Sequence, residues 1–368
     1  MPSASLRLAV VGAGAAGLAA ARELRREGHA PVVFERAAAV GGTWLYTPPA
    51  ATSSDPLGAA ATHSSLYASL RTNLPRETMG FLDFPFSAAV PGSADPRRFP
   101  GHEEVLRYLQ AFARRFDLLR LIRFETEVLR VRRVDRGGWA VTSRKLGDKG
   151  SGEEEVYDAV VVCNGHYTEP RIAVIPGVDA WPGKQMHSHN YRVPEPFLDQ
   201  VVIIIGASAS AVDISRDIAS TAKEVHIADR SALAHTCVKQ HGYNNLWLHS
   251  MVIPFPMFQL QSKWVAGVLS GRIVLPSKEQ MMEDVETFYS KLEARGWPKR
   301  YTHNFANYQF EYDDWLAEQC GHPAIEEWRK QMYHINGINK AIRPERYRDE
   351  WDDDHLVAEA NEDFKKYL

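Results

Sequence analysis

The stretch LRLAVVGAGAAG, residues 6–17, decides the fold class of this chain. Its first half is an apolar run that predicts a buried strand over 6–11. A helical pattern follows from Ala15 to Glu27 and ends at Gly28, and a second strand is predicted over 31–35. A strand, a helix and a second strand in this order predict the opening of a doubly wound, parallel α/β sheet.

The glycines of this stretch have the spacing of a dinucleotide-binding fingerprint. Gly12 permits the tight turn after the strand, Gly14 lets the backbone approach a pyrophosphate, and Gly17 lets helix and strand pack closely. The helix N-terminus offers unpaired N–H groups and the positive end of its dipole to the phosphates. Glu35 follows 18 residues after Gly17, where a carboxylate can bind ribose hydroxyls. The residues predicted to bind this cofactor are Gly12, Ala13, Gly14, Ala15, Ala16, Gly17 and Glu35.

A second pair of glycines lies in the motif GGTW, residues 41–44. Paired glycines just after the acid-bearing strand suit another close approach to the cofactor, which is more often FAD than NAD. Read by itself, the motif is equally typical of an ordinary turn. The residues predicted to contact the cofactor here are Gly42, Thr43 and Trp44.

A weaker copy of the fingerprint, GASASA, occupies residues 206–211 after a strand predicted to be strongly buried over 201–205. Ser208 and Ala211 stand in for glycines and are small enough for similar geometry. Arg230 follows the next predicted strand, where a guanidinium can pair with a 2′-phosphate, so NADPH is favoured over NADH. The alternative is a solvated arginine in a turn. The residues predicted to bind NADPH are Gly206, Ala207, Ser208, Ala209, Ser210, Ala211 and Arg230.

Periodicity and capping signals predict the other elements. The predicted helices cover 102–116, 209–220 and 277–296, the last opened by a capping box at Ser277–Gln280. The predicted strands cover 128–134, 139–142, 159–163 and 224–228. A charged, glycine-rich segment over 145–155 is predicted to be a surface turn.

Composition excludes several classes of protein. A chain of 368 residues with a net charge of −3 has room for two domains and no basic field for nucleic acid. Its three cysteines form no CxxC or CxxxxC pair, which argues against flavin disulfide reductases and fits a reduced, cytoplasmic setting. The apolar run 8–21 has the length of a signal-peptide core, but cleavage after it would destroy the fingerprint. Elsewhere no run reaches the ~18 apolar residues that span a bilayer.

Two dinucleotide sites in one chain predict hydride transfer from NADPH to a flavin, with the cofactors supplying the chemistry. The partner expected is a small-molecule substrate, and the oligomeric state stays open. His187 and His189 form an HxH pair, but no third ligand lies nearby in the sequence, so no metal site is predicted.

Several motifs in order resemble those of the plant flavin-containing monooxygenases, especially the glucosinolate S-oxygenase-like branch. They are GAGAAG at 12–17, GGTW at 41–44, LRTNLPRETMGFLDFPF at 70–86, CNGHY at 163–167, GKQMHSHNY at 183–191 and GASASAVDI at 206–214. The stretch from Trp181 to Tyr191 is similar to the identifying motif FxGxxxHxxxY, with tryptophan in place of phenylalanine. The resemblance covers nearly the whole chain.

The resemblance implies two Rossmann-like domains, with the NADPH domain inserted in the FAD domain. The implied bounds are 1–168 for the FAD domain, 169–253 for the NADPH domain and 254–368 for a helical part that packs on the FAD domain. It also implies that NADPH reduces FAD, and that the reduced flavin activates oxygen for transfer to a soft nucleophile, most simply a thioether sulfur. A Baeyer–Villiger or indole-pyruvate type monooxygenase is the alternative within the same motifs.

By the same resemblance, Asn73 would be the catalytic residue, beside the flavin and donating a hydrogen bond to the activated oxygen, with Thr72 adjacent. The chemistry needs such a donor and protection from water, because activated oxygen is otherwise lost as hydrogen peroxide. Read without the family, Asn73 before Leu-Pro is simply a turn residue.

The family pattern breaks after residue 228. More βα units and a buried strand ending in a Thr-Gly-Tyr-like turn should follow, yet residues 243–250 run directly into 254–264, which resembles a much later segment. The join at 251–253 would then lack ~60 residues or more, about two βαβ-sized units. We therefore predict an incomplete NADPH domain with exposed apolar strands, in a splice or gene-model variant. A catalytically impaired, FAD-binding chain is the functional alternative.

Overall fold

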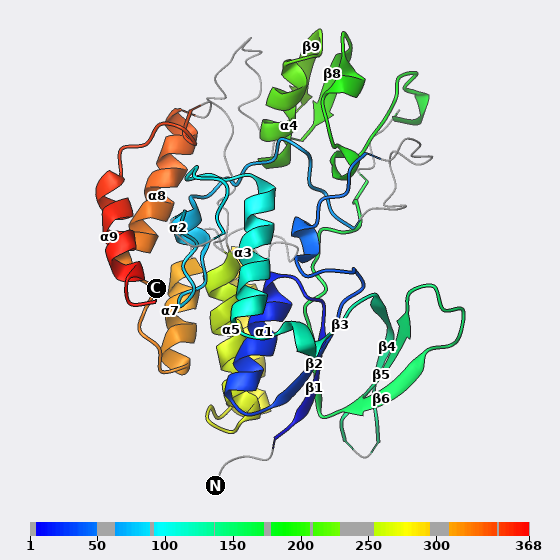
Figure 1. Ribbon diagram of the computed structural model, residues 1–368, viewed down its shortest axis with the longest axis vertical. Coiled ribbons are helices and arrows are strands. Elements are labelled where there is room, and N and C mark those ends of the chain that lie inside the picture. The colour runs from blue at the N-terminus through cyan, green and yellow to red at the C-terminus, as the bar shows by residue number, and fades with distance from the viewer. Residues whose placement is uncertain are drawn as a thin grey trace.

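The computed structural model of the protein describes residues 5–49, 63–88, 92–135, 137–172, 178–206, 209–228, 254–294, 309–343 and 346–367. Figure 1 shows a lower part that combines the N-terminal sheet with the C-terminal helices. A smaller group of elements, β8, α4 and β9, lies above it. The alternation of strands and helices confirms the α/β class.

The larger parallel sheet has the strand order β3-β2-β1-β7. β1 pairs with β2 from Arg7↔Ala30 to Val11↔Phe34, and on its other side β1 pairs with β7. The predicted βαβ opening is therefore confirmed, to within one residue at most of its ends. The strands are β1 (Arg7–Val11), β2 (Ala30–Phe34), β3 (Ile122–Arg123) and β7 (Ala159–Val162).

Helices cover one face of this sheet and form the main core with it. α1 (Ala15–Arg26) packs against α5 (Pro254–Leu269), as Figure 1 shows, and against α3 (His102–Arg115). Leu18 of α1 is fully buried, because its face of the helix lies between the sheet and these neighbours. The C-terminal third of the chain thus completes the core that the first thirty residues begin.

A separate antiparallel sheet confirms the predicted hairpin and adds a strand to it. Its strands, in the order β4-β5-β6, are β4 (Thr126–Arg133), β5 (Trp139–Lys145) and β6 (Glu153–Tyr157). The prediction of a surface turn over 145–155 was wrong at its end, because Glu153 pairs with Ser143 and begins β6. The run of glutamates gave no strand signal in the sequence, because the only deeply buried side chain of β6 is that of Tyr157.

The second βαβ unit consists of β8 (Val201–Ile205), α4 (Ala209–Ala219) and β9 (Glu224–Ala228). The strands pair in parallel, and no third strand joins them among the residues that the structure describes. The prediction that β8 is strongly buried was wrong: Val201, Ile203 and Ile205 are 56%, 49% and 62% exposed. Only the opposite face of β8 packs, through Val202 and Ile204, in the cluster that also holds Ile214 of α4.

The C-terminal helices are α6 (Lys278–Ala294), α7 (Gln309–Gln319), α8 (Glu327–Ile342) and α9 (Asp354–Phe364). The predicted capping box opens α6: Gln280 N donates to Ser277 Oγ, and Ser277 N donates to Gln280 Oε1. α8 packs on α2 (Arg76–Met79), where Arg329 donates to the carbonyls of Glu77, Thr78 and Gly80.

Among the described helices, none is long and apolar enough to cross a membrane. The predicted join at 251–253 lies outside the described residues.

Short 3-10 helices complete the described elements. They are η1 (Gly42–Trp44), η2 (Leu119–Leu121), η3 (Val178–Ala180), η4 (Ser188–Asn190) and η5 (Glu195–Phe197).

Candidate functional site

The glycines of the first fingerprint lie where side chains would not fit. Gly12 has φ +104°, and a Cβ there would lie 2.4 Å from the carbonyl oxygen of Cys163, which follows β7. A Cβ on Gly17 would lie 1.8 Å from the carbonyl oxygen of Gly12. The turn and the close packing of helix on strand that these glycines were predicted to permit are therefore both present.

The GGTW segment lies directly against this turn. Gly41 N donates to Ala13 O at 3.1 Å, and a Cβ on Gly42 would lie 3.0 Å from the Cα of Gly14. Two glycine backbones thus face each other at the N-terminus of α1, where N–H groups without an intrahelical partner point outward. This cradle of backbone without side chains fits a pyrophosphate. Thr43 is exposed beside it, and Trp44 packs partly into the main core.

Glu35 lies at the end of β2 as predicted and is 8% exposed. Its carboxylate accepts hydrogen bonds from Ala13 N and from Ala37 N, both at 2.7 Å. The acid is thereby fixed beside the glycine turn. Ala15 is buried and Ala16 half-buried in the first turn of α1.

Thr72 and Asn73 lie on a segment between helices that bends at Asn73, and three other parts of the chain hold it. Thr72 N donates to Pro100 O at 2.8 Å, Arg348 Nε donates to Thr72 O at 2.9 Å, and Asn336 Nδ2 donates to Asn73 O at 3.2 Å. Thr72 is buried and Asn73 is half-buried. The main chain at the predicted catalytic residue is therefore fixed from both sides.

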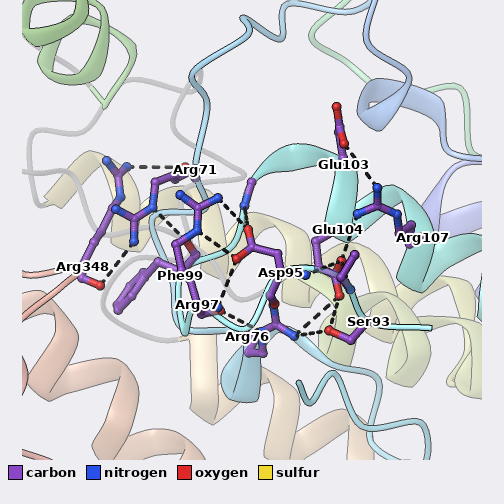
Figure 2. A network of polar contacts seen from close by, with 12 residues as sticks. Arg71, Arg76, Ser93, Asp95, Arg97, Phe99, Glu103, Glu104, Arg107 and Arg348 are labelled. Carbon is purple, nitrogen blue, oxygen red and sulfur yellow. Dashed lines mark hydrogen bonds and ion pairs between the residues drawn. The ribbon is translucent and has the colours of Figure 1, made fainter. Parts of the chain in front are cut away.

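A polar network fixes the loop 93–101 that carries Pro100, as Figure 2 shows. Asp95 accepts from Gly101 N at 2.8 Å and from the guanidinium of Arg97, whose hydrogen bonds hold the pKa of the Asp95 carboxyl well below its usual range. Arg76, 1% exposed, donates to the carbonyls of Asp95 and Arg97. Glu104 of α3 accepts from Ser93 Oγ and from two main-chain N–H groups of the loop. The loop is thus a rigid support for Thr72.

Arg192 joins the stretch that follows GGTW to the motif that ends at Tyr191. Its buried guanidinium donates to four carbonyls, those of Thr47, Ser64, His189 and Tyr191. Burial lowers the pKa of Arg192, and these carbonyls compensate for the lost water. The stretch after GGTW therefore has a fixed position relative to the motif that ends at Tyr191.

The second fingerprint is only partly described. Gly206 has φ +104°, the same value as Gly12, and leads into α4, which contains the half-buried Ala209, the exposed Ser210 and the buried Ala211. Ala207, Ser208 and Arg230 lie outside the described residues. The described part fits the turn of a dinucleotide site.

Cys163 and the HxH pair, which the sequence also singled out, make structural contacts. Burial raises the pKa of the Cys163 thiol to about 12, so this cysteine is inert beside the glycine turn. His187 and His189 lie around η4, where His189 N donates to His187 Nδ1. Within the described ranges no group of three metal-ligating side chains occurs.

Sequence reasoning missed Asn336, Arg348 and Arg192. Each acts on main-chain carbonyls far away in the sequence, and Asn336 lies 263 residues from Asn73. Such contacts leave no motif, so no local signal could have identified them.

Comparison with known proteins places the chain in a family. The model of the flavin-binding monooxygenase-like family matches residues 5–253. Flavin-containing monooxygenase FMO GS-OX-like 3 of Arabidopsis thaliana is 50% identical, and the match covers 100% of this chain and 98% of that protein. Flavin-containing monooxygenase FMO GS-OX5 of the same plant is 48% identical, with 98% and 95% covered.

Solved structures agree. The structure of S-allyl-L-cysteine S-oxygenase from Allium sativum matches with a TM-score of 0.92 and 51% identity over 100% of both chains. Tmm from Pelagibacter sp. shares the fold with a TM-score of 0.74 at 22% identity. The alignment to FMO GS-OX-like 3 runs over 446 positions, whereas this chain has 368 residues. At least 78 positions of the alignment therefore have no counterpart in this chain.

The glycine cradle, the fixed acid and these matches lead to one conclusion. The chain belongs to the flavin-containing monooxygenase family and is a monooxygenase with FAD and NADPH as its cofactors.

Proposed function

We propose that this protein oxygenates the sulfur atom of a small thioether, using NADPH and molecular oxygen. The observation that carries the proposal is the match over the whole of both chains to an S-oxygenase, at 51% identity and a TM-score of 0.92. The intact glycine cradle and the fixed Thr72–Asn73 segment support it, because both lie in the matched part.

The proposed reaction balances as follows. The thioether, O2, NADPH and a proton give the sulfoxide, NADP⁺ and water. The chemistry that FAD supplies is acceptance of a hydride from NADPH and transfer of one oxygen atom to sulfur.

Residues of the chain have three tasks in this proposal. The cradle of Gly12, Gly14 and Gly42, with Glu35, holds the pyrophosphate and ribose of FAD. Asn73 donates a hydrogen bond near the reacting oxygen, and the buried Thr72 beside it excludes water. The turn at Gly206, together with Ala207, Ser208 and Arg230, binds NADPH.

The first test is the absorbance spectrum of the purified protein during anaerobic titration with NADPH, then with NADH. We expect a bound flavin that bleaches with NADPH at far lower concentration than with NADH. Air and S-allyl-L-cysteine are then added, and the sulfoxide is measured by mass spectrometry. A ketone substrate serves as the control, since formation of an ester instead of a sulfoxide would contradict S-oxygenation.

The role of Asn73 is tested by Asn73→Ala. We expect this variant to keep its FAD content and its rate of bleaching by NADPH, because neither depends on the Asn73 amide. Sulfoxide per NADPH consumed should fall at least tenfold, with hydrogen peroxide formed instead, on the scale of losing one positioned donor. Unchanged sulfoxide yield would remove Asn73 from the site.

A second function has specific support: a chain that binds FAD but reacts slowly with NADPH because its NADPH domain is incomplete. The exposed face of β8, the 67% exposure of Val162 at the end of β7, and the 78 unmatched positions all favour it. We propose the domain bounds 1–168, 169–253 and 254–368, with the missing units between residues 228 and 254. In a parallel sheet such units would cover β8.

The same titration separates the two functions. If the flavin bleaches on photochemical reduction but stays oxidised with NADPH, the second function holds. A full-length transcript that supplies the missing strands should then restore bleaching by NADPH when it is expressed in place of this chain.

We also propose that the protein acts in the cytoplasm, because its three cysteines form no predicted disulfide framework. Fluorescence microscopy of a tagged protein in plant cells tests this location, and signal confined to an organelle would contradict it.

A further inference from the structure

A single arginine near the C-terminal end connects the second βαβ unit to the main chain beside Asn73. Arg348 Nε donates to Thr72 O at 2.9 Å, and its Nη2 lies 2.7 Å from Asp213 Oδ2 of α4. The two side chains are only 14% and 17% exposed. A charge-assisted hydrogen bond with this little water is strong and directional, so it fixes the plane of the guanidinium.

α4 supplies further contacts to the same segment. Asp213 also accepts from Tyr67 OH at 3.2 Å. Asp217, one turn later on the same face of the helix, accepts from Ser69 Oγ at 2.7 Å and from Tyr191 OH. Two carboxylates of the helix that follows Gly206 thus bind the residues that lead to Asn73.

A second C-terminal residue acts on the next peptide. Asn336 is 5% exposed and donates from Nδ2 to Asn73 O, while its Oδ1 has no partner among the described residues. Leaving a buried amide oxygen unpaired opposes folding. The contribution of Asn336 visible in the structure is therefore the hydrogen bond to the peptide of Asn73.

We propose that Arg348 is a positioning residue for Asn73: Asp213 orients its guanidinium, the guanidinium holds the carbonyl of Thr72, and Asn336 holds that of Asn73. The inference rests on the proposed role of Asn73 in oxygenation. It makes the geometry at Asn73 depend on α4, and therefore on the part of the chain that carries the second fingerprint.

The test separates positioning from stability with paired variants. Arg348→Met leaves Asp213 buried without its partner and should lower the melting temperature. Arg348→Met combined with Asp213→Asn removes that buried charge, and Tyr67 OH still has an acceptor. The control is Arg346→Met, two residues away, where Arg346 is exposed and, among the described residues, forms an ion pair with the exposed Glu350.

Two readouts are measured on the FAD-loaded protein. The first is amide hydrogen exchange of the peptide spanning residues 70–75. The second is the ratio of hydrogen peroxide to sulfoxide after photochemical reduction of the flavin and mixing with oxygen and S-allyl-L-cysteine. We expect the double variant to recover most of the melting temperature, to exchange at least threefold faster at 70–75, and to raise the ratio at least threefold. Arg346→Met should match the wild type in both.

A further variant separates charge from geometry. Arg348→Lys keeps a cation beside Asp213 but cannot reach Asp213 and Thr72 O together with a planar fork. It should therefore retain stability and still show the raised ratio.

Wild-type exchange and a wild-type ratio in the double variant would overturn the proposal. If the wild-type protein itself makes no sulfoxide, S-oxygenation fails, while the exchange experiment still decides whether Arg348 holds the segment.

Discussion

The two βαβ units of this chain use the same turn but differ in what surrounds it. Gly12 and Gly206 both have φ +104°. A Cβ at Gly12 would lie 2.4 Å from Cys163 O, whereas nothing among the described residues lies within 4 Å of a Cβ at Gly206. The strands differ in the same way, since Val10 of β1 is fully buried and Ile203 of β8 is 49% exposed.

This difference shows that a glycine fingerprint determines the local turn but not whether the domain around it is complete. β1 lies between β2 and β7, which together bury both of its edges, while helices cover one of its faces and the antiparallel sheet packs on the other. β8 pairs with β9, and no other described strand pairs with either. A glycine pattern therefore predicts the local backbone well, while completeness of a cofactor site depends on strands elsewhere in the sequence.

Alanine at each of the two glycines gives the largest expected contrast. Gly12→Ala combines an unfavourable positive φ with an overlap against backbone that has nowhere to move, so we expect a loss of about 3–5 kcal/mol and no bound FAD. Gly206→Ala has the same strain without the overlap, and about 1–2 kcal/mol is expected. Flavin content and melting temperature are measured for both variants. Equal losses of stability would show that the surroundings of the two turns do not differ in this way.

Threonine at one apolar position of each strand is the next test. Val10→Thr buries a hydroxyl in an apolar core and should cost about 2 kcal/mol. Ile203→Thr should change stability by less than about 0.5 kcal/mol, because half of the side chain is already in water. Thermal unfolding followed by circular dichroism measures both variants. A cost at Ile203 as large as that at Val10 would show that β8 is covered in solution.

A buried carboxyl on the FAD side gives a smaller, pH-dependent contrast. Burial raises the pKa of Asp313 on α7 to about 7, and Gln309 Nε2 donates to its carboxyl at 3.1 Å. The folded state holds a proton that the unfolded state loses near pH 4, so this contribution to stability is lost as pH rises through about 7. Asp313→Asn should stabilise the protein more at pH 8 than at pH 5, by roughly 2–3 kcal/mol, because about two pH units of that loss lie between pH 5 and pH 7.

The matched control for Asp313 lies on the second unit. Glu224 of β9 has a side chain that is 54% exposed, and Glu224→Gln should change the unfolding free energy by less than about 0.5 kcal/mol at either pH. Urea unfolding at pH 5 and pH 8 measures both variants. A pH-independent gain at Asp313 would mean that its carboxyl is solvated.

The sequence predicted those parts of the fold that depend on neighbours in the chain. β1, α1 and β2, the turn at Gly12 and the place of Glu35 all follow from periodicity and glycine spacing, and the structure has them within a residue or two. The capping box at Ser277 is equally local and was equally predictable. The roles assigned to Asn73 and to the second fingerprint stay predictions until ligands are bound.

What the sequence did not reveal depends on distant contacts. The apolar composition of β8 predicts a buried strand. Composition does not tell whether the strands that would cover it are present. β6 was missed because cross-strand pairing with β5 outweighs the low strand propensity of its glutamates. The supports of Asn73 were missed because a side chain that donates to a distant carbonyl obeys no spacing rule.

The contact of α1 with α5 has a consequence for the length of the chain between them. It closes a loop of about 230 residues, and the entropy of loop closure grows only with the logarithm of length. A loop longer by the 78 unmatched positions would cost only about 0.3 kcal/mol more to close. Insertion or loss of whole βα units within this loop is thus nearly neutral for the flavin half, which keeps its own ends together regardless of what lies between them.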